Sequence, residues 1–214
     1  MEWGWQHRRM SAPRVTEKTK IFEIEIVLED VRPPVRRLIQ VPGDASLAVL
    51  HEVVQSAMGW TDSHLHEFEI GGQRYGMPDP DWDDGDVADE AKVKLFRLVG
   101  LGERLGYVYD FGDNWAHTLL VKQVIAPQPG VRYPRCVSGR GACPPEDVGG
   151  GPWGYDEFQA VLADPAHPGH DERTEWAGGP FDPNRFELDE ANQALDWLAW
   201  RPLSTQSAGD PRGR

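Results

Sequence analysis

The chain first becomes regular in residues 21–28, IFEIEIVL, where apolar and charged positions alternate. Such a period of two predicts a strand with one buried face, here the face of Phe22, Ile24, Ile26 and Leu28. The prolines at 33 and 34 predict a turn. Residues 35–41, VRRLIQV, then predict a second strand, so the two segments form a hairpin.

The period changes after this hairpin. Apolar residues recur at helical spacing at Leu47, Leu50, Val53, Val54 and Ala57. Asp44 or Ser46 is the expected N-cap of this helix, and Gly59 suits a left-handed C-terminal position. A hairpin followed directly by a packed helix is typical of a β-grasp (ubiquitin-like) unit. The predicted fold class is therefore α+β with a β-grasp opening.

Further strands are predicted downstream, and we expect a second hairpin with a tight turn at residues 112–114. The strand-like segments are residues 66–70, 73–76, 93–99, 107–111 and 115–125. Residues 135–155 are rich in glycine and proline and predict a long loop. Helices are expected at 155–163, where the following proline ends the helix at Asp164, and at 188–200. We expect one domain over residues 21–202, with flexible tails at 1–20 and 203–214.

Charge and composition narrow the classes of partner. Residues 1–20 carry a net charge of +3 and residues 203–214 carry +1. Because the net charge of the whole chain is −13, residues 21–202 carry −17. Such an acidic body argues against a general nucleic-acid-binding surface. The sequence has no apolar run long enough for a membrane span, and its two cysteines are too few for a disulfide scaffold. The expected location is the cytoplasm.

Five segments between residues 21 and 200 carry a family resemblance: VRPPVRRLIQVP, LHEVVQSAMGWTDSHLHEFEI, YVYDFGDNWAHTLLV, CVSGRGACPPEDVGGGPWGY and FDPNRFELDEANQAL. In this order they resemble the plasmid pRi ORF-three-like family, whose members are also named TnpR passenger proteins of transposons and insertion elements. The resemblance implies an α+β fold with a ubiquitin-like portion, an association with mobile elements and no established reaction. A resolvase would need a nucleophilic serine among arginines, a cluster that the sequence lacks.

Two segments supply candidate residues for a polar pocket. In HLHE, a strand beginning at His64 would point His64 and His66 to one face, as two ligands of one metal, and Glu67 to the other. The predicted hairpin turn places Asp110, Asp113 and His117 close together, although turn chemistry alone explains short polar residues there.

The glycine-rich loop contributes Glu146 and Asp147 to the same candidate pocket. It also holds Cys136 and Cys143, which could bind zinc together with His167 and His170. The six-residue spacing of the cysteines is not that of a tight zinc knuckle. We therefore favour a rigid scaffold role for the cysteines.

The acidic run after residue 78 is a further candidate. Its carboxylates at Asp79, Asp81, Asp83 and Glu90 follow the spacing of a calcium loop, but Asp84 replaces the required glycine. We favour a solvated acidic loop.

Two functions follow from these observations. The first is a non-enzymatic module that binds another macromolecule, most simply a protein, because no complete catalytic constellation is visible. The alternative is a metal-dependent hydrolase or nuclease, in which His64, His66 and Glu67 meet Asp110, Asp113 or His117 around a divalent metal. Convergence of these side chains in one concave pocket would favour the second function.

Overall fold

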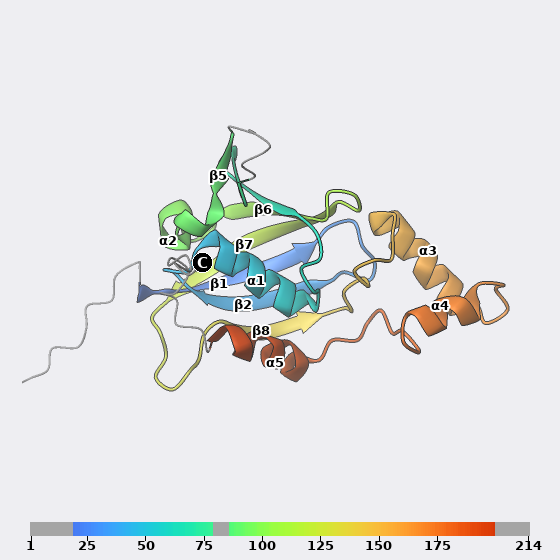
Figure 1. The fold of residues 1–214 in the computed structure, drawn as a ribbon. Helices are drawn as coiled ribbons and strands as arrows, with labels where there is room; N and C mark the ends of the chain where they lie inside the picture. The colour runs from blue at the N-terminus through green and yellow to red at the C-terminus, as the bar shows by residue number, and fades with distance from the viewer. Residues whose placement is uncertain (1–18, 79–85, 200–214) are drawn as a thin grey trace, which may run out of the picture.

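The computed structural model describes residues 19–78 and 86–199. An eight-stranded sheet runs through the molecule in the order β5-β4-β3-β6-β7-β1-β2-β8 (Figure 1). Its strands are β1 (Ile21–Leu28), β2 (Arg36–Pro42), β3 (His66–Ile70), β4 (Gln73–Gly76), β5 (Val87–Asp89), β6 (Arg104–Tyr109), β7 (Trp115–Ile125) and β8 (Arg135–Arg140). All neighbouring pairs are antiparallel except β4 and β5, so the sheet is mixed.

Helices cover one face of this sheet and one end of it (Figure 1). They are α1 (Leu47–Met58), the short η2 (Glu90–Lys92), α2 (Leu95–Leu98), α3 (Gly151–Ala163), α4 (His170–Trp176) and α5 (Leu188–Ala199). Helix α5 packs beside α1 and β8. Helices α3 and α4 lie at the end of the sheet around an aromatic cluster of Tyr155, Phe158, Trp176 and Phe181.

The predicted hairpin and helix at the start of the chain are confirmed. Strands β1 and β2 pair with Ile24 opposite Ile39. The Ser46 side chain, the cap of α1, accepts a hydrogen bond from the Val49 amide at 3.3 Å. Gly59 ends the helix with a φ of 90°, a left-handed conformation that a side chain would disfavour.

The alternation in β1 separates a buried face from a solvated one. Ile24 and Ile26 are fully buried in the main hydrophobic cluster together with Leu50 of α1. On the opposite face Glu25 lies near Arg36 and Lys122 at 3.6 and 3.8 Å. One covered and one wet face is the usual state of a largely antiparallel sheet.

Two sequence predictions for secondary structure are wrong. Residues 93–99 do not form a strand; instead, α2 begins at Leu95, whose amide donates to the Ala45 carbonyl at 3.0 Å. The amides of Leu95 and Phe96 both donate to carbonyls of the segment before α1, so they are not available to a neighbouring strand. Residues 135–155 are not one long loop, because β8 pairs with β2 and α3 begins at Gly151.

The fold class α+β is confirmed, and the hairpin–helix opening lies within a larger mixed sheet. The second hairpin, β6 and β7, is also confirmed, as are α5 and the end of α3 at Asp164. None of the helices in the described ranges is long and apolar enough to cross a membrane.

Candidate functional site

Helix α1 buries polar side chains as well as apolar ones. His51 and Gln55, one turn apart, are 4% and 3% exposed. The Tyr107 hydroxyl on β6 lies 2.8 Å from His51 Nδ1 and accepts a hydrogen bond from Gln55 Nε2 at 2.9 Å. Burying such groups costs free energy unless they are hydrogen-bonded. Tyr107 therefore satisfies both polar residues of the helix from the sheet below.

Asp62 lies in the connection that follows α1 and turns back over the helix. Its carboxylate oxygen is 2.8 Å from His51 Nε2, and its backbone amide donates to Gln55 Oε1 at 3.2 Å. Its φ of 60° is the left-handed conformation, which aspartate tolerates better than most residues. The turn thus brings a carboxylate to a histidine eleven residues earlier.

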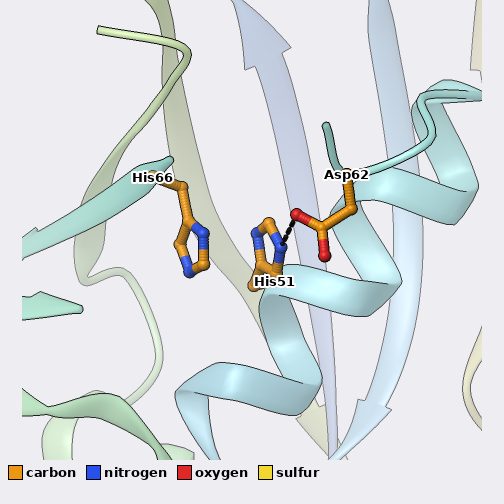
Figure 2. A group of neighbouring side chains, drawn as sticks. All are labelled: His51, Asp62 and His66. Carbon is orange, nitrogen blue, oxygen red and sulfur yellow. Dashed lines mark hydrogen bonds and ion pairs between the residues drawn. The ribbon is translucent and has the colours of Figure 1, made fainter. Parts of the chain in front are cut away.

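His66, the first residue of β3, completes the group. Its ring stacks on the His51 ring with centroids 3.4 Å apart and planes 5° from parallel. Its Nε2 lies 2.9 Å from a carboxylate oxygen of Glu90, and both side chains are almost fully buried. Figure 2 shows His51 between His66 and Asp62.

One potential ligand atom each from His51, Asp62 and His66 lies within 4.8 Å of the other two. Within the described ranges this is the only group of three or more His, Cys, Asp or Glu side chains that converges in this way. The group lines an open pocket of about 520 Å³, with exposed Leu65 and Met77 among its other lining residues. The site is therefore open to a ligand, with apolar side chains at its rim.

The donor set fits a divalent transition metal. Two imidazoles and one carboxylate bind catalytic zinc and non-haem iron, with further positions open to water or substrate. Burial, and then the neighbouring His66, lower the pKa of His51, so its neutral form, the one that binds metals, is favoured. If a metal bound here, Tyr107 beside His51 Nδ1 and Glu90 beside His66 Nε2 would be the outer partners of the two histidine ligands.

The stacked rings limit how an ion could enter. A metal lies in the plane of each imidazole that binds it, and the planes of two rings stacked 5° from parallel do not meet within metal–ligand distance of both rings. One ring must therefore tilt. His66 is the freer ring, because hydrogen bonds hold His51 at both nitrogens, whereas those that the structure describes hold His66 at Nε2.

A second polar cluster joins the loop at residues 141–150 to the connection between α1 and β3. His64 Nε2 lies 3.1 Å from Asp147 and 3.7 Å from Asp110. The hydrogen bond with Asp147, which outweighs partial burial, raises the pKa of His64. Beside it, Glu146 accepts hydrogen bonds from the Tyr109 hydroxyl and from the α1–β3 connection. His64 and His66 line the same pocket but have different hydrogen-bond partners, because β3 begins at His66 and the alternation of a strand does not extend back to His64.

His117 lies beneath both clusters. It is opposite Tyr107 in the sheet and its ring meets the Trp60 ring edge-on. Among the residues that the structure describes, neither ring nitrogen has a hydrogen-bond partner, and the same holds for Trp115 Nε1. Burial lowers the pKa of His117 to about 4. His117 is therefore neutral at neutral pH and buried, and it is not part of the group of converging ligand atoms in the described residues.

The other predicted residues lie apart from the inner group. Glu67 points away and binds Arg74 at 2.6 Å. Asp113 lies in the β6–β7 turn, where its carbonyl approaches Gly151 so closely that a side chain at 151 would collide with it. In the acidic run, Glu90 pairs with His66, while Asp79, Asp81 and Asp83 lie outside the described residues.

The two cysteines, His167 and His170 also do not converge on one another in the described part of the chain. Both cysteines are free. The buried Cys136 thiol donates to the Ser138 carbonyl at 3.3 Å, and burial raises the pKa of Cys143. His167 Nδ1 accepts from the Gly169 amide at 3.1 Å, and His170 lies 3.2 Å from Asp171.

Known proteins are similar to this chain in sequence and in fold. The model of the plasmid pRiA4b ORF-3-like proteins matches residues 20–190. The chain belongs to the plasmid pRiA4b ORF-3-like family. It is similar to the uncharacterised protein y4hQ of Sinorhizobium fredii, with 42% identity over 182 residues, 84% of this chain and 92% of that protein. The crystal structure of MM3350, a protein of unknown function from Methanosarcina mazei Go1, is similar with a TM-score of 0.74 and 34% identity, over 80% of this chain and 97% of that one.

In this ORF-3-like protein, sequence reasoning missed His51 and Asp62. His51 stands between Leu50 and Glu52 in a segment of helical period, and this position by itself does not mark it as a ligand. A signal existed: His51 and Gln55 are spaced by four, so they share a side of the helix that is polar although the helix is packed. Asp62 gave no comparable signal, since a short polar residue after a helix is ordinary in a turn.

Proposed function

We propose that the protein binds a divalent transition-metal ion through His51, Asp62 and His66. The observation that carries this proposal is the convergence of three ligand atoms from α1, the following connection and β3 at the wall of an open pocket. An ion held there would lower the pKa of a bound water and so supply a nucleophile for hydrolysis. Of the ligands predicted for the hydrolase site, this proposal keeps only His66. His51 and Asp62 take the place of the others.

Metal analysis of protein purified without chelator tests this proposal. We expect about one zinc, iron or manganese ion per chain, or uptake of one added ion with a rise in melting temperature. His51→Ala and His66→Ala should each abolish the uptake. His167→Ala, a change of the same type at a histidine outside the group, should leave it unchanged. Fewer than about one ion per ten chains, with no shift on adding metal, would refute the proposal.

A second candidate is the binding of a protein partner. It is supported by Trp153, which is 86% exposed in the first turn of α3. Exposed tryptophan is enriched where proteins bind one another. The β-grasp likeness of β1, β2 and α1 belongs to this candidate, since a ubiquitin-like sheet offers a face and an edge for partners. An association with mobile elements would supply such partners from the same element.

Affinity capture from the native host tests the second candidate. A specific partner should be lost with Trp153→Ala and retained with Leu101→Ala, which removes another exposed apolar side chain, between α2 and β6. Equal capture by both variants would show that Trp153 is not the contact.

A further inference from the structure

The loop at residues 141–150 holds the connection that carries Asp62. Glu146 Oε2 accepts hydrogen bonds from the Thr61 amide at 2.9 Å and from the Thr61 hydroxyl. Its Oε1 accepts from the Ser63 amide at 3.2 Å and from the Tyr109 hydroxyl. The Glu146 carboxylate thus accepts four hydrogen bonds. One comes from β6 and three come from the α1–β3 connection, which lies up to 85 residues earlier in the chain.

Asp62 lies between the two amides that Glu146 binds. Its own amide is held by Gln55, so hydrogen bonds fix three consecutive residues of this connection. The left-handed φ of 60° at Asp62 costs free energy for a residue with a side chain and persists where the surroundings hold it. This conformation places the carboxylate 2.8 Å from His51 Nε2.

We propose that Glu146 is the positioning residue of the metal site, which holds Asp62 in the conformation that ligates the ion. This inference rests on the proposed function. Glu146 touches neither histidine ligand in the described hydrogen bonds, and it acts through the backbone on either side of Asp62.

The chemistry of the contact suits this role. Burial would raise the pKa of Glu146, but the hydrogen bonds from Thr61, Tyr109 and the two amides outweigh it and hold the pKa below its usual range. The group therefore stays ionised at neutral pH, and hydrogen bonds to a carboxylate are about twice as strong as neutral ones. Glutamine at position 146 would keep the shape of the side chain but would have one acceptor oxygen in place of two. Its amide nitrogen cannot accept a hydrogen bond from the donors that face it.

Titration with Co²⁺, which reports its coordination through visible absorption, tests the inference on the full chain. We expect Glu146→Ala to weaken Co²⁺ binding by about 10- to 100-fold, the usual effect of losing an outer partner of a metal ligand. Glu146→Gln should weaken it less. Glu157→Ala, which removes an exposed carboxylate of α3, should bind as the wild type does.

A coupling measurement separates positioning from general destabilisation. If Glu146 acts through Asp62, Asp62→Asn should weaken Co²⁺ binding strongly in the wild type and much less in the Glu146→Ala background. Independent, additive losses would overturn the inference, and so would equal affinities of Glu146→Ala and the wild type. Failure of the wild type itself to bind Co²⁺, Zn²⁺ or Mn²⁺ would instead overturn the proposed function.

If Glu146→Ala does not fold, milder changes decide the question. Thr61→Val removes one of the four donors and keeps the size of the side chain. It and Glu146→Gln should each reduce the affinity by a smaller factor, with an altered Co²⁺ spectrum. Unchanged affinity and spectrum in both variants would overturn the inference.

Discussion

The two buried sides of helix α1 are built on different principles. On one side Leu50, Val53 and Val54 are fully buried in the hydrophobic cluster that includes Ile24. On the other side His51 and Gln55 are as deeply buried, and hydrogen bonds link them to Tyr107 and Asp62. Apolar contacts are non-directional and many, whereas each polar group depends on one or two partners in fixed geometry. The apolar side therefore supplies stability, and the polar side supplies a defined arrangement at the pocket.

The largest effect is expected on the apolar side. Leu50→Ala removes a fully buried side chain and should lower the free energy of unfolding by about 2–5 kcal/mol, through lost burial and the cavity left behind. Leu101→Ala, at an exposed position, should change it by less than about 0.5 kcal/mol. Urea unfolding of both variants measures the difference. A loss below about 1 kcal/mol at Leu50 would contradict the division of the helix into two sides.

Acid should act through the buried His117 of β7, whose ring lies against Tyr107. His117 has a pKa of about 4 in the folded protein, against an ordinary value of 6.5. Between these values the unfolded chain binds a proton that the folded chain does not, so stability falls as the pH falls from about 6.5 to 4. The full loss is about 3 kcal/mol, and no such loss occurs above pH 6.5. Urea unfolding across this pH range should show a smaller loss in His117→Phe than in the wild type; parallel curves would contradict the burial of a neutral His117.

Removing the shared hydroxyl tests the network that joins the helix to the sheet. Tyr107→Phe leaves buried polar groups of His51 and Gln55 without their partner and should cost about 1–3 kcal/mol. Tyr133→Phe, which removes a hydroxyl bonded to the exposed Gln128 amide, should cost less than about 0.5 kcal/mol. Thermal and urea melts compare the two. Equal losses of unfolding free energy in the two variants would show that a hydroxyl on the buried polar side matters no more to stability than one at the surface.

The smallest effect is expected in the exposed cluster around His64. The hydrogen bond that His64 Nε2 donates to the Asp147 carboxylate is the main cause of the raised pKa of His64, so Asp147→Asn should move this pKa back toward its ordinary value. Asp113→Asn, in the nearby turn, should leave it in place. NMR titration of the His64 ring protons gives both values. An unchanged pKa in Asp147→Asn would assign the shift to Asp110 and the other carboxylates.

Features that depend on neighbouring residues along the chain could be predicted from the sequence. The alternation in residues 21–28, the helical period of α1 with its Ser46 and Gly59 ends, and the β6–β7 turn were all predicted, because periodic burial and caps are local properties. Local patterns gave a wrong secondary structure where tertiary hydrogen bonds set the backbone conformation. Residues 93–99 look like a strand, but the segment before α1 receives their hydrogen bonds.

Which side chains meet in the candidate site depends on tertiary contacts. His66 was expected beside His64, but its partners are His51 and Glu90, whereas His64 faces Asp147. These pairings join residues 15 to 83 positions apart, and no spacing rule links a residue of α1 to one of β3 or of the glycine-rich loop. A hydrogen bond or a metal ligand needs atoms within a few ångströms at a defined angle. The packing of α1 on the sheet and of residues 141–150 on the α1–β3 connection set those positions.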